Sequence, residues 1–573
     1  MASTSVANPY PMTCDERNWL YKHHKHLVEI PTISDPKFFN SDNMMRAARY
    51  LEERLNKLGF TTRLVTIEGS APYVLAERSS DLTAPTYLLY NHYDVQPVEP
   101  SDWDTDPFTL TTKEKAVYAR GAADNKGGVM ATLAMLRMAQ KRGQTLPNIK
   151  ILFEGEEESG SPHLLQLFEQ ERDFLKADAM VVMDGEDAQV LASASRGIAD
   201  VTLTVNPKAA QQALSSVTSS GALEYYPSHP QRYVHITLNV RALEKPYHSG
   251  IGVLLPDCTQ ALAEFAVLLE KSKIVGKIHV VDMAAGQPDG GNVIQDRAEC
   301  TIAIPVDSLD ETGEILQTIR RYLFLQDIGK QFVWSCTPHK ELYGFTPNNG
   351  SALVLAKLIH SLKKPETIEG FMEGYPGIAD DEREMIRRTS QTLEEYVLGK
   401  GMLSGTELRG DPRVSIDERI VELPSLSILN MQADGRSGKA AVSIRVLAGQ
   451  DPNKVAAVVA RHLKEVASAH SLEITAEPHT DGAWAWKADI SAPSSQEYLK
   501  SLGKGFEKAR FQPCGGTNPL LAAIAQIGIP AIVPANQTST SNAHSHNESQ
   551  DLDSWEISIG CYLDFILNSA RKS

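Results

Sequence analysis

Several features that would define other classes of protein are missing from this sequence of 573 residues. Only six cysteines are present and none forms a CxxC pair, which disfavours a disulfide framework or a structural zinc knuckle and favours a reducing, cytoplasmic compartment. No stretch approaches 18 uninterrupted apolar residues and no apolar run of signal-peptide type opens the chain, so no membrane span is expected. Basic residues are in deficit: the net charge of −16 argues against nucleic acid or an anionic membrane as partner.

The composition that is present is that of a globular protein, with 42% hydrophobic and 22% charged residues. Residues 15–199 alternate helical and strand patterns. They contain an amphipathic helical pattern over 46–58 and short apolar runs over 86–91, 149–153 and 179–183 that each stop at polar residues. Such runs are typical of buried strands in a mainly parallel sheet. Sites in such α/β folds lie at the carboxyl ends of the strands.

A second pattern runs over residues 200–485, where strands of alternating polarity are separated by helical stretches. Two segments in it, 298–323 and 440–463, each read as a strand, an Asp-containing loop and a helix. They indicate a repeated unit, and the alternative is a chance likeness between two strand–helix units. Residues 486–573 return to the first pattern. We therefore predict a catalytic domain formed by 15–199 and 486–573, with 200–485 inserted as a second domain.

Histidine and acidic residues follow the apolar runs. His92 and Asp94 come directly after the first run. A neutral imidazole is a good zinc ligand, and residues two apart on an extended segment face the same way, so Asp94 can reach the other ring nitrogen. A plain structural hydrogen bond is the alternative. Asp124 lies in a glycine-rich segment before a predicted helix, and it either caps that helix or bridges two metals with its two oxygens.

Further acidic residues follow the next two runs. Three consecutive carboxylates, Glu156, Glu157 and Glu158, repel one another at a sheet end unless cations neutralise them, and a solvated acidic turn is the alternative. Asp184 ends the third run, where an ordinary turn residue is the alternative. His544 lies in a polar loop, a place where a solvent-exposed histidine is common. Together these positions predict a metal-dependent site.

The motifs YNHYDVQP, ARGAADNKGG, FEGEEESGSP, MDGED and AHSHNE carry these residues. Their order and surroundings resemble a family of co-catalytic zinc peptidases. That family holds carnosinases, cytosolic nonspecific dipeptidases, glutamate carboxypeptidase, aminoacylase and succinyl-diaminopimelate desuccinylase. The likeness covers most of 15–200 and 420–560. It implies an α/β catalytic domain with a mainly parallel sheet and an inserted, ferredoxin-like α+β lid domain, which the two similar segments would make a duplicated one.

The resemblance implies two divalent metal ions, with zinc expected and manganese or cobalt as alternatives. The metal ligands that it implies are His92 and Asp184 for one ion, Glu158 and His544 for the other, and Asp124 as the bridge. Three carboxylates against four positive charges leave a residual positive charge that lowers the pKa of a shared water and polarises the scissile carbonyl. The AHSxNE frame favours His544 over His546 as the ligand.

The resemblance also assigns the two remaining acidic roles. Glu157 would be the general base and Asp94 would orient His92. The spacing of EGEEESG favours Glu157 over its neighbour Glu156. An aspartate at position 184 favours dipeptidase or aminopeptidase specificity, although Glu186 nearby leaves the carboxypeptidase-like alternative open.

Substrate-binding residues are expected in the inserted domain and in one turn of the segment 486–573. Those that the resemblance implies are His248, Asn292, Arg445, Gly516 and Thr517. His248 would stabilise the developing oxyanion, with His339 as a rival, and Arg445 would grip a substrate carboxylate with a bidentate pair. An ordinary loop histidine and a surface ion pair are the respective alternatives. We expect either a homodimer or a monomer whose doubled lid imitates a dimer.

The main prediction is therefore a metallopeptidase that hydrolyses the amide bond of small peptides, a dipeptidase or aminopeptidase with a Glu general base. An N-acyl amino acid amidohydrolase and a carboxypeptidase of the same fold are alternatives. A metal-free binding subunit is a third alternative, which the full ligand set disfavours.

Overall fold

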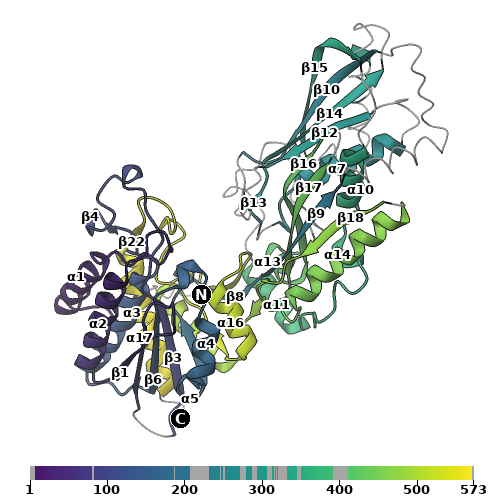
Figure 1. Ribbon diagram of the computed structural model, residues 1–573. Coiled ribbons are helices and arrows are strands. Elements are labelled where there is room, and N and C mark those ends of the chain that lie inside the picture. The colour runs from purple at the N-terminus through teal and green to yellow at the C-terminus, as the bar shows by residue number, and fades with distance from the viewer. Residues whose placement is uncertain are drawn as a thin grey trace, which may run out of the picture. The chain divides into compact units, whose positions relative to one another are not determined.

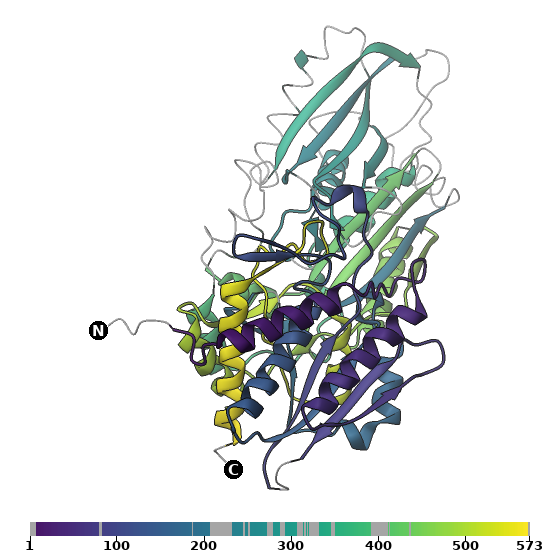
Figure 2. The same cartoon turned by 90° about the vertical axis from the view of Figure 1, so that its left-hand side faces the viewer.

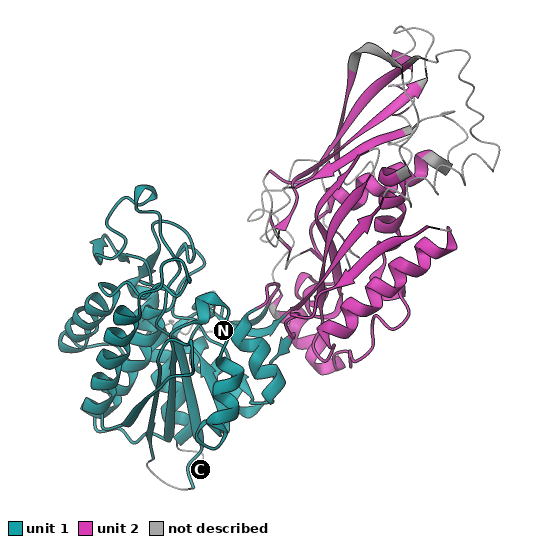
Figure 3. Ribbon diagram, viewed as in Figure 1, with its two compact units in different colours: residues 1–195, 486–513, 518–573 teal, residues 196–485, 514–517 magenta. Residues whose placement is uncertain are grey.

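In the computed structural model the chain divides into two compact units (Figure 3). Unit 1 comprises Met1–Ser195, Trp486–Pro513 and Asn518–Ser573, and unit 2 comprises Arg196–Ala485 and Cys514–Thr517. The residues that the structure describes are 7–79, 83–185, 187–206, 232–244, 247–249, 252–271, 279–286, 293–305, 313–314, 317, 319, 332–344, 350–390, 409, 411, 413–434, 437–470 and 472–570. The division into domains at 15–199, 200–485 and 486–573 stays a prediction.

Unit 1 is built on a six-stranded sheet with the strand order β1-β2-β6-β3-β7-β21 (Figure 1). Its strands are β1 (Thr61–Val65), β2 (Tyr73–Arg78), β3 (Thr86–His92), β6 (Asn148–Glu154), β7 (Ala179–Val182) and β21 (Ala531–Ile532). β6, β3, β7 and β21 run parallel, while β1 and β2 add an antiparallel edge. The three predicted apolar runs thus form three adjacent parallel strands, whose carboxyl ends meet at one edge of the sheet.

The main helices of unit 1 are α1 (Cys14–Val28), α2 (Ser41–Lys57), α3 (Lys126–Lys141), α4 (Leu164–Gln170), α5 (Arg172–Leu175), α15 (Pro493–Gly505), α16 (Pro519–Ile527) and α17 (Leu552–Ala570). α3 packs on β3 and lies against both α1 and α17, which come from opposite ends of the chain (Figure 2). α2 begins before the predicted helix because the Asn40 side chain caps it by accepting from the amide of Asn43. No helix in the described part of the chain is both long and apolar enough to cross a membrane.

Two small sheets complete unit 1. They are formed by β8 (Val190–Ser195), β19 (Trp486–Lys487) and β20 (Arg510–Cys514), and by β4 (Thr111–Lys113), β5 (Ala116–Tyr118) and β22 (Ser549–Asp551). In the second of these sheets β22 pairs with β5, so the segment before α17 is joined to the segment before α3. This pairing brings the loop at 535–548 to the side of the glycine-rich loop at 119–125.

Unit 2 is built on an eight-stranded antiparallel sheet with the strand order β15-β10-β14-β12-β16-β17-β9-β18. Its strands are β9 (Gly197–Val205), β10 (Arg232–Arg241), β12 (His279–Ala285), β14 (Arg297–Pro305), β15 (Val333–Gly344), β16 (Ser425–Ala433), β17 (Gly438–Val446) and β18 (Ile474–Pro478). Its main helices are α7 (Cys258–Lys271), α10 (Gly350–Ser361), α11 (Asp380–Thr389), α13 (Ile416–Glu422) and α14 (Pro452–Ala469).

The strand order resolves into two nested ferredoxin-like repeats. The outer repeat runs β9, α10, β16, β17, α14 and β18, and the inner repeat, with the described elements β10, α7, β12, β14 and β15, lies between β9 and α10 in the chain. Each repeat places its first, second, third and fourth strand in the spatial order 4-1-3-2. The two segments that resemble each other in sequence supply the third strand of each repeat, β14 and β17, so the predicted duplicated α+β fold is confirmed. Most of the helix expected after β14 lies outside the described residues.

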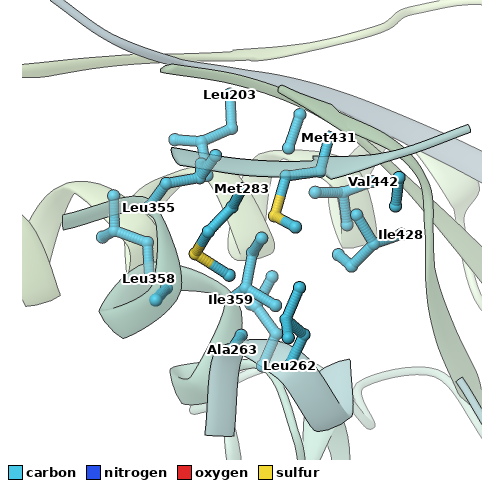
Figure 4. Close-up of a cluster of buried hydrophobic side chains, with 14 of the residues drawn as sticks. Leu203, Leu262, Ala263, Met283, Leu355, Leu358, Ile359, Ile428, Met431 and Val442 are labelled. Atoms are coloured by element: carbon cyan, nitrogen blue, oxygen red, sulfur yellow. The ribbon is translucent and has the colours of Figure 1, made fainter. Parts of the chain in front are cut away.

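The two repeats share one hydrophobic core. They join where β12 pairs with β16, with Met283 opposite Ala433 and Ala285 opposite Met431. In Figure 4, Met283 of the inner repeat lies beside Leu355, Leu358 and Ile359 of α10 from the outer repeat. Since one buried cluster contains residues of both repeats, the main core of unit 2 is continuous across them, beside a small separate cluster of Val253, Leu254, Ile416 and Ile420.

The shared core predicts the cost of truncating α10. Leu358 is fully buried in this cluster, so Leu358→Ala should destabilise the protein by about 2–5 kcal/mol, through lost burial and the cavity left behind. Leu165→Ala, on the exposed face of α4, is the matched control and should change stability by less than about 0.5 kcal/mol. Urea unfolding checks both, and equal effects of the two variants would contradict the shared core.

Candidate metal centre

The candidate metal ligands come from three strand ends and two loops of unit 1. His92 is the last residue of β3, Asp184 follows β7 by two residues, and Glu158 lies in the 3-10 turn η2 (Glu157–Ser159) after β6. Asp124 precedes α3, and His544 lies in the loop before β22. The parallel pairing of β6, β3 and β7 and the pairing of β22 with β5 gather them.

Asp124 lies between the two histidines. Its Oδ1 is 3.2 Å from Nε2 of His92, and its Oδ2 is 3.1 Å from Nε2 of His544. On the first side, Oδ1 of Asp184 lies 3.7 Å from His92 Nε2. On the second side, Oε2 of Glu158 lies 3.0 Å from His544 Nε2. The five residues therefore form two histidine–carboxylate pairs that share one aspartate, which is the grouping that the sequence predicted.

Asp94 contacts His92 on the side of the ring that faces away from Asp124. Its Oδ1 lies 3.3 Å from Nδ1 of His92, the ring nitrogen that faces away from Asp124. Both of its carboxylate oxygens also accept backbone amides, from Glu157 at 3.2 Å and from Glu158 at 2.9 Å. Asp94 thus contacts both the imidazole, which also lies 3.2 Å from its backbone carbonyl, and the acidic turn.

The consecutive glutamates have different surroundings. Glu157 points an oxygen to within 4.0 Å of His92 Nε2. Glu156 instead accepts a hydrogen bond from the Tyr73 hydroxyl and contacts Nδ1 of His163 at 3.0 Å. Of the two candidates for the general base, only Glu157 has a described contact with the histidine pair.

The two candidate histidines of the polar loop are also distinct. His544 has a left-handed backbone, φ 62°, and its side chain makes the ion pairs with Asp124 and Glu158. His546 is exposed, and no contact with the cluster is among those described for it. The geometry therefore brings His544, and not His546, into the site.

Sequence reasoning missed the residue that fixes the glycine-rich loop, Glu548. This fully buried carboxylate pairs with Arg120 at 2.7 Å and accepts the backbone amides of Gly121, Ala123 and Asp124 at 2.9–3.0 Å. Its signal in the sequence was the last letter of the AHSHNE motif, to which no role was assigned. Glu548 belongs to the same loop as His544, so one segment contains a candidate ligand and binds the backbone of the aspartate that contacts it.

Two neutral side chains, which sequence reasoning also missed, complete the positioning. Asn125 donates to Oδ1 of Asp184 at 2.7 Å, and Gln96 donates to Oε2 of Glu158 at 2.9 Å. Asn125 rather than Asp124 occupies the N-cap position of α3. The helix-capping alternative for Asp124 is therefore wrong, and its carboxylate is available to the two histidines.

The electrostatics of the cluster show an excess of negative charge. Burial raises the pKa of Glu157 well above its usual value, and the carboxylates of Asp184 and Glu158 add to the rise. The positive charge of His92 opposes it. Hydrogen bonds to Asp124 and Glu158 raise the pKa of His544 to about 11. The two imidazoles are surrounded by five carboxylates, those of Asp94, Asp124, Glu157, Glu158 and Asp184. When ionised, these carry more negative charge than two imidazolium ions can neutralise.

This donor set fits divalent cations. Ligand atoms of His92, Asp124 and Glu158 all lie within 4.8 Å of one another, which identifies a candidate metal site among the described residues. Imidazole and carboxylate donors suit zinc, and also manganese or cobalt. A cation would supply the positive charge that the buried carboxylates lack.

The predicted substrate-binding residues belong to unit 2. Arg445 lies on β17 and donates to the Thr517 hydroxyl at 2.6 Å, in the turn that also contains Gly516. His248 lies on the short strand β11 (Tyr247–His248), and His339 lies on β15. Asn292 and Glu186 lie outside the described residues. The roles predicted for these residues stay predictions.

Unit 1 is a mixed α/β unit, and two histidine–carboxylate pairs that share one aspartate lie at its strand ends. This combination is typical of a metal-dependent class of protein. Residues 88–568 match the model of the peptidase family M20/M25/M40. The chain belongs to this family, and membership implies that it binds divalent metal. The resemblance predicted from the sequence motifs is thereby confirmed.

Individual relatives agree with this assignment. The chain is 32% identical over 227 residues to the cysteinylglycine-S-conjugate dipeptidase of Corynebacterium striatum, covering 39% of this chain and 43% of that protein. It is 39% identical over 160 residues to the Beta-Ala-His dipeptidase of Mus musculus, covering 26% of this chain and 32% of that protein. The matches thus span less than half the length of these curated relatives.

A solved structure extends the likeness to the whole fold. The aminoacylhistidine dipeptidase from Vibrio alginolyticus superposes with a TM-score of 0.66, covering 100% of this chain and 99% of that chain at 16% sequence identity. At that identity the match shows the fold. The predicted catalytic and lid architecture of the family is therefore confirmed.

The contacts of Glu548 generate a prediction for the loop. Glu548→Gln removes the charge that holds Arg120 and weakens three amide contacts of the loop at 121–124. Leaving Arg120 buried without its partner should cost about 3–5 kcal/mol and lower the affinity for metal. Thermal unfolding and metal content of the purified variant measure the two effects.

The control is Glu171→Gln, which removes the partner of Arg63 in an exposed ion pair. Exposed pairs contribute about 0–1 kcal/mol, so this variant should behave like wild type. If Glu548→Gln were as stable and as metal-rich as the control, the loop would not depend on this carboxylate.

Proposed function

We propose that this chain is a metal-dependent peptidase that hydrolyses the amide bond of dipeptides. The observation that carries the proposal is Asp124, which directs one oxygen toward each of two histidine–carboxylate pairs beside Glu157. The names of the relatives, which are dipeptidases acting on cysteinylglycine conjugates and on Beta-Ala-His, support dipeptides as the substrate class.

The site is proposed to hold two divalent ions, with zinc expected. His92 and Asp184 would bind one ion, Glu158 and His544 the other, and Asp124 both. When bound, the ions lower the pKa of a water molecule and polarise the scissile carbonyl. The buried excess of carboxylates supports this stoichiometry, because a single divalent ion would leave one histidine–carboxylate pair without a cation.

Glu157 is proposed to carry the proton. Its carboxylate accepts a proton from the attacking water and delivers it to the leaving amine nitrogen, which makes it the general base and then the general acid. Asp94 keeps this side chain in place through the amides of Glu157 and Glu158, and orients His92 through Nδ1.

Unit 2 is proposed to bind the rest of the substrate. Arg445 would hold the substrate carboxylate, His248 would stabilise the oxyanion, and the turn containing Gly516 and Thr517 would approach the substrate backbone. The nested repeats of unit 2 support a monomeric enzyme, because one chain contains both halves of the eight-stranded sheet. Sedimentation of the purified chain distinguishes a monomer from a homodimer.

Activity assays test the proposal directly. The purified chain is treated with a chelator and then given zinc, manganese or cobalt, and hydrolysis is followed for Beta-Ala-His, cysteinylglycine and N-acetyl amino acids. The proposal expects that dipeptide hydrolysis disappears with the metal and returns on its addition. Hydrolysis of the N-acetyl amino acids alone would instead identify an amidohydrolase, and no hydrolysis of any substrate with metal present would overturn the enzyme proposal.

Glu157→Gln should keep both metals and lose activity. The amide has nearly the same shape but accepts no proton, so kcat should fall by about 10²–10⁴-fold with the metal content unchanged. Glu156→Gln is the matched control, since that residue contacts Tyr73 and His163 instead. If the control lost the larger share of kcat, the base would be Glu156.

His544→Ala should lower the metal content. The substitution removes one proposed ligand of the second ion, so the bound metal should fall from two toward one per chain. The control is His546→Ala, two residues along the same loop, which should retain both ions. Elemental analysis of the two variants decides between the histidines, and retention of two ions by His544→Ala would contradict the ligand assignment.

A further inference from the structure

Two arginines of unit 2, Arg196 and Arg445, are buried side by side. Their exposed fractions are 2% and 1%. A guanidinium keeps its charge in proteins, and burial of a charge is costly unless an opposite charge compensates it. The hydrogen-bond partners described for both side chains are neutral hydroxyls and backbone carbonyls. The pair therefore carries two buried positive charges without a directly bonded carboxylate.

Several donors of the pair have no acceptor in the described part of the chain. Arg445 donates to the hydroxyls of Thr517 at 2.6 Å and Ser249 at 2.8 Å, and its Nε has no described partner. Among the described residues, Nη2 of Arg196 donates to the carbonyls of Leu423 and Arg445, while its buried Nε and Nη1 have no partner there. Unsatisfied charged donors of this kind are rare in folded proteins and call for an acceptor.

The backbone holds Arg196 firmly at this position. Its amide donates to the carbonyl of Gly516 at 3.0 Å, and its carbonyl accepts the Thr517 hydroxyl at 2.7 Å. The next residue is Gly197, where a Cβ would lie 2.4 Å from the carbonyl oxygen of Ala483. Only glycine fits there, so the backbone after Arg196 packs directly against another segment. Arg196 is thus fixed between the Gly516–Thr517 turn and the strand that carries Arg445.

The charges of the two arginines act on each other. Burial lowers the pKa of Arg196 to about 9, and the neighbouring charge of Arg445 adds to this effect. Burial also lowers the pKa of Arg445, to about 10, while the charge of Asp200 opposes the change. An anion bound between the guanidinium groups would offset the burial and the repulsion of both.

We propose that Arg196 is a second carboxylate-binding residue, which acts beside Arg445 on the terminal carboxylate of the substrate. This inference rests on the proposed function and adds a specificity-determining residue to it. A carboxylate supplies the negative charge and the acceptors that the unpartnered donors of Arg196 lack. A neutral amide supplies no charge, so a site with two guanidinium groups selects peptides that end in a free carboxylate at this position.

The test compares a dipeptide with its C-terminal amide in the metal-loaded protein. The wild type should prefer the dipeptide. Arg196→Met should raise the KM for the dipeptide by roughly ten-fold or more and change that for the amide by less than about two-fold, so that the preference for the carboxylate is lost. Arg196→Lys keeps the charge without the fork and should retain part of the preference.

The matched control is Arg419→Met. Arg419 is also buried in unit 2, at 3% exposure, but it donates to backbone carbonyls including those of Val414 and Arg409. This variant should lower the unfolding temperature and keep the preference for the carboxylate. If Arg196→Met lowered kcat/KM equally for dipeptide and amide, as a purely structural residue would, the proposal would be wrong.

A binding measurement separates this proposal from the proposed function. Calorimetric titration with N-acetylglycine and N-acetylglycinamide needs no turnover, and the wild type should bind the acid more tightly, a difference that Arg196→Met abolishes. If the wild type binds the acid selectively but hydrolyses no dipeptide, the proposed function fails and the role of Arg196 stands. If it binds acid and amide equally, the carboxylate site does not exist.

Discussion

The arrangement of unit 1 depends on one shared carboxylate. Asp124 contacts both histidines at nearly equal distances, so its position decides whether the pairs on either side face each other. That position is set by the acceptor of its own amide, Glu548, which also pairs with Arg120. Because Glu548 and His544 belong to one loop, the packing of that loop positions both the aspartate and the second histidine.

Much of unit 1 could be predicted from the sequence, because its signals are local. Apolar runs that stop at polar residues identify β3, β6 and β7, and parallel strands bring residues such as His92 and Asp184 to one edge. The topology of unit 2 was partly visible, because β14 and β17 keep a similar strand-and-helix pattern. Their place as the third strand of each repeat comes from pairing between strands far apart in the sequence, which no local pattern encodes.

Other residues could not be found, because their importance depends entirely on their surroundings. Glu548 was one acid in a polar loop, and only the structure supplies the three amides and the arginine that it binds. Arg196 precedes a strand, where an arginine is ordinarily exposed, and its burial beside Arg445 depends on the turn at 514–517 folding back onto it. Sequence patterns identify what a residue can do, and tertiary contacts decide which residues are placed to do it.

The assembly of the metal cluster from distant segments has a consequence for biosynthesis. A ribosome completes β3, β6 and β7 early, but it then makes the whole of unit 2 before it reaches His544 and Glu548. Until that moment the nascent chain contains His92, Asp124, Glu158 and Asp184 but lacks the carboxylate of Glu548, which binds the glycine-rich loop in the folded protein. All the candidate ligands are therefore present in the chain only after all of unit 2 and most of unit 1 have been translated.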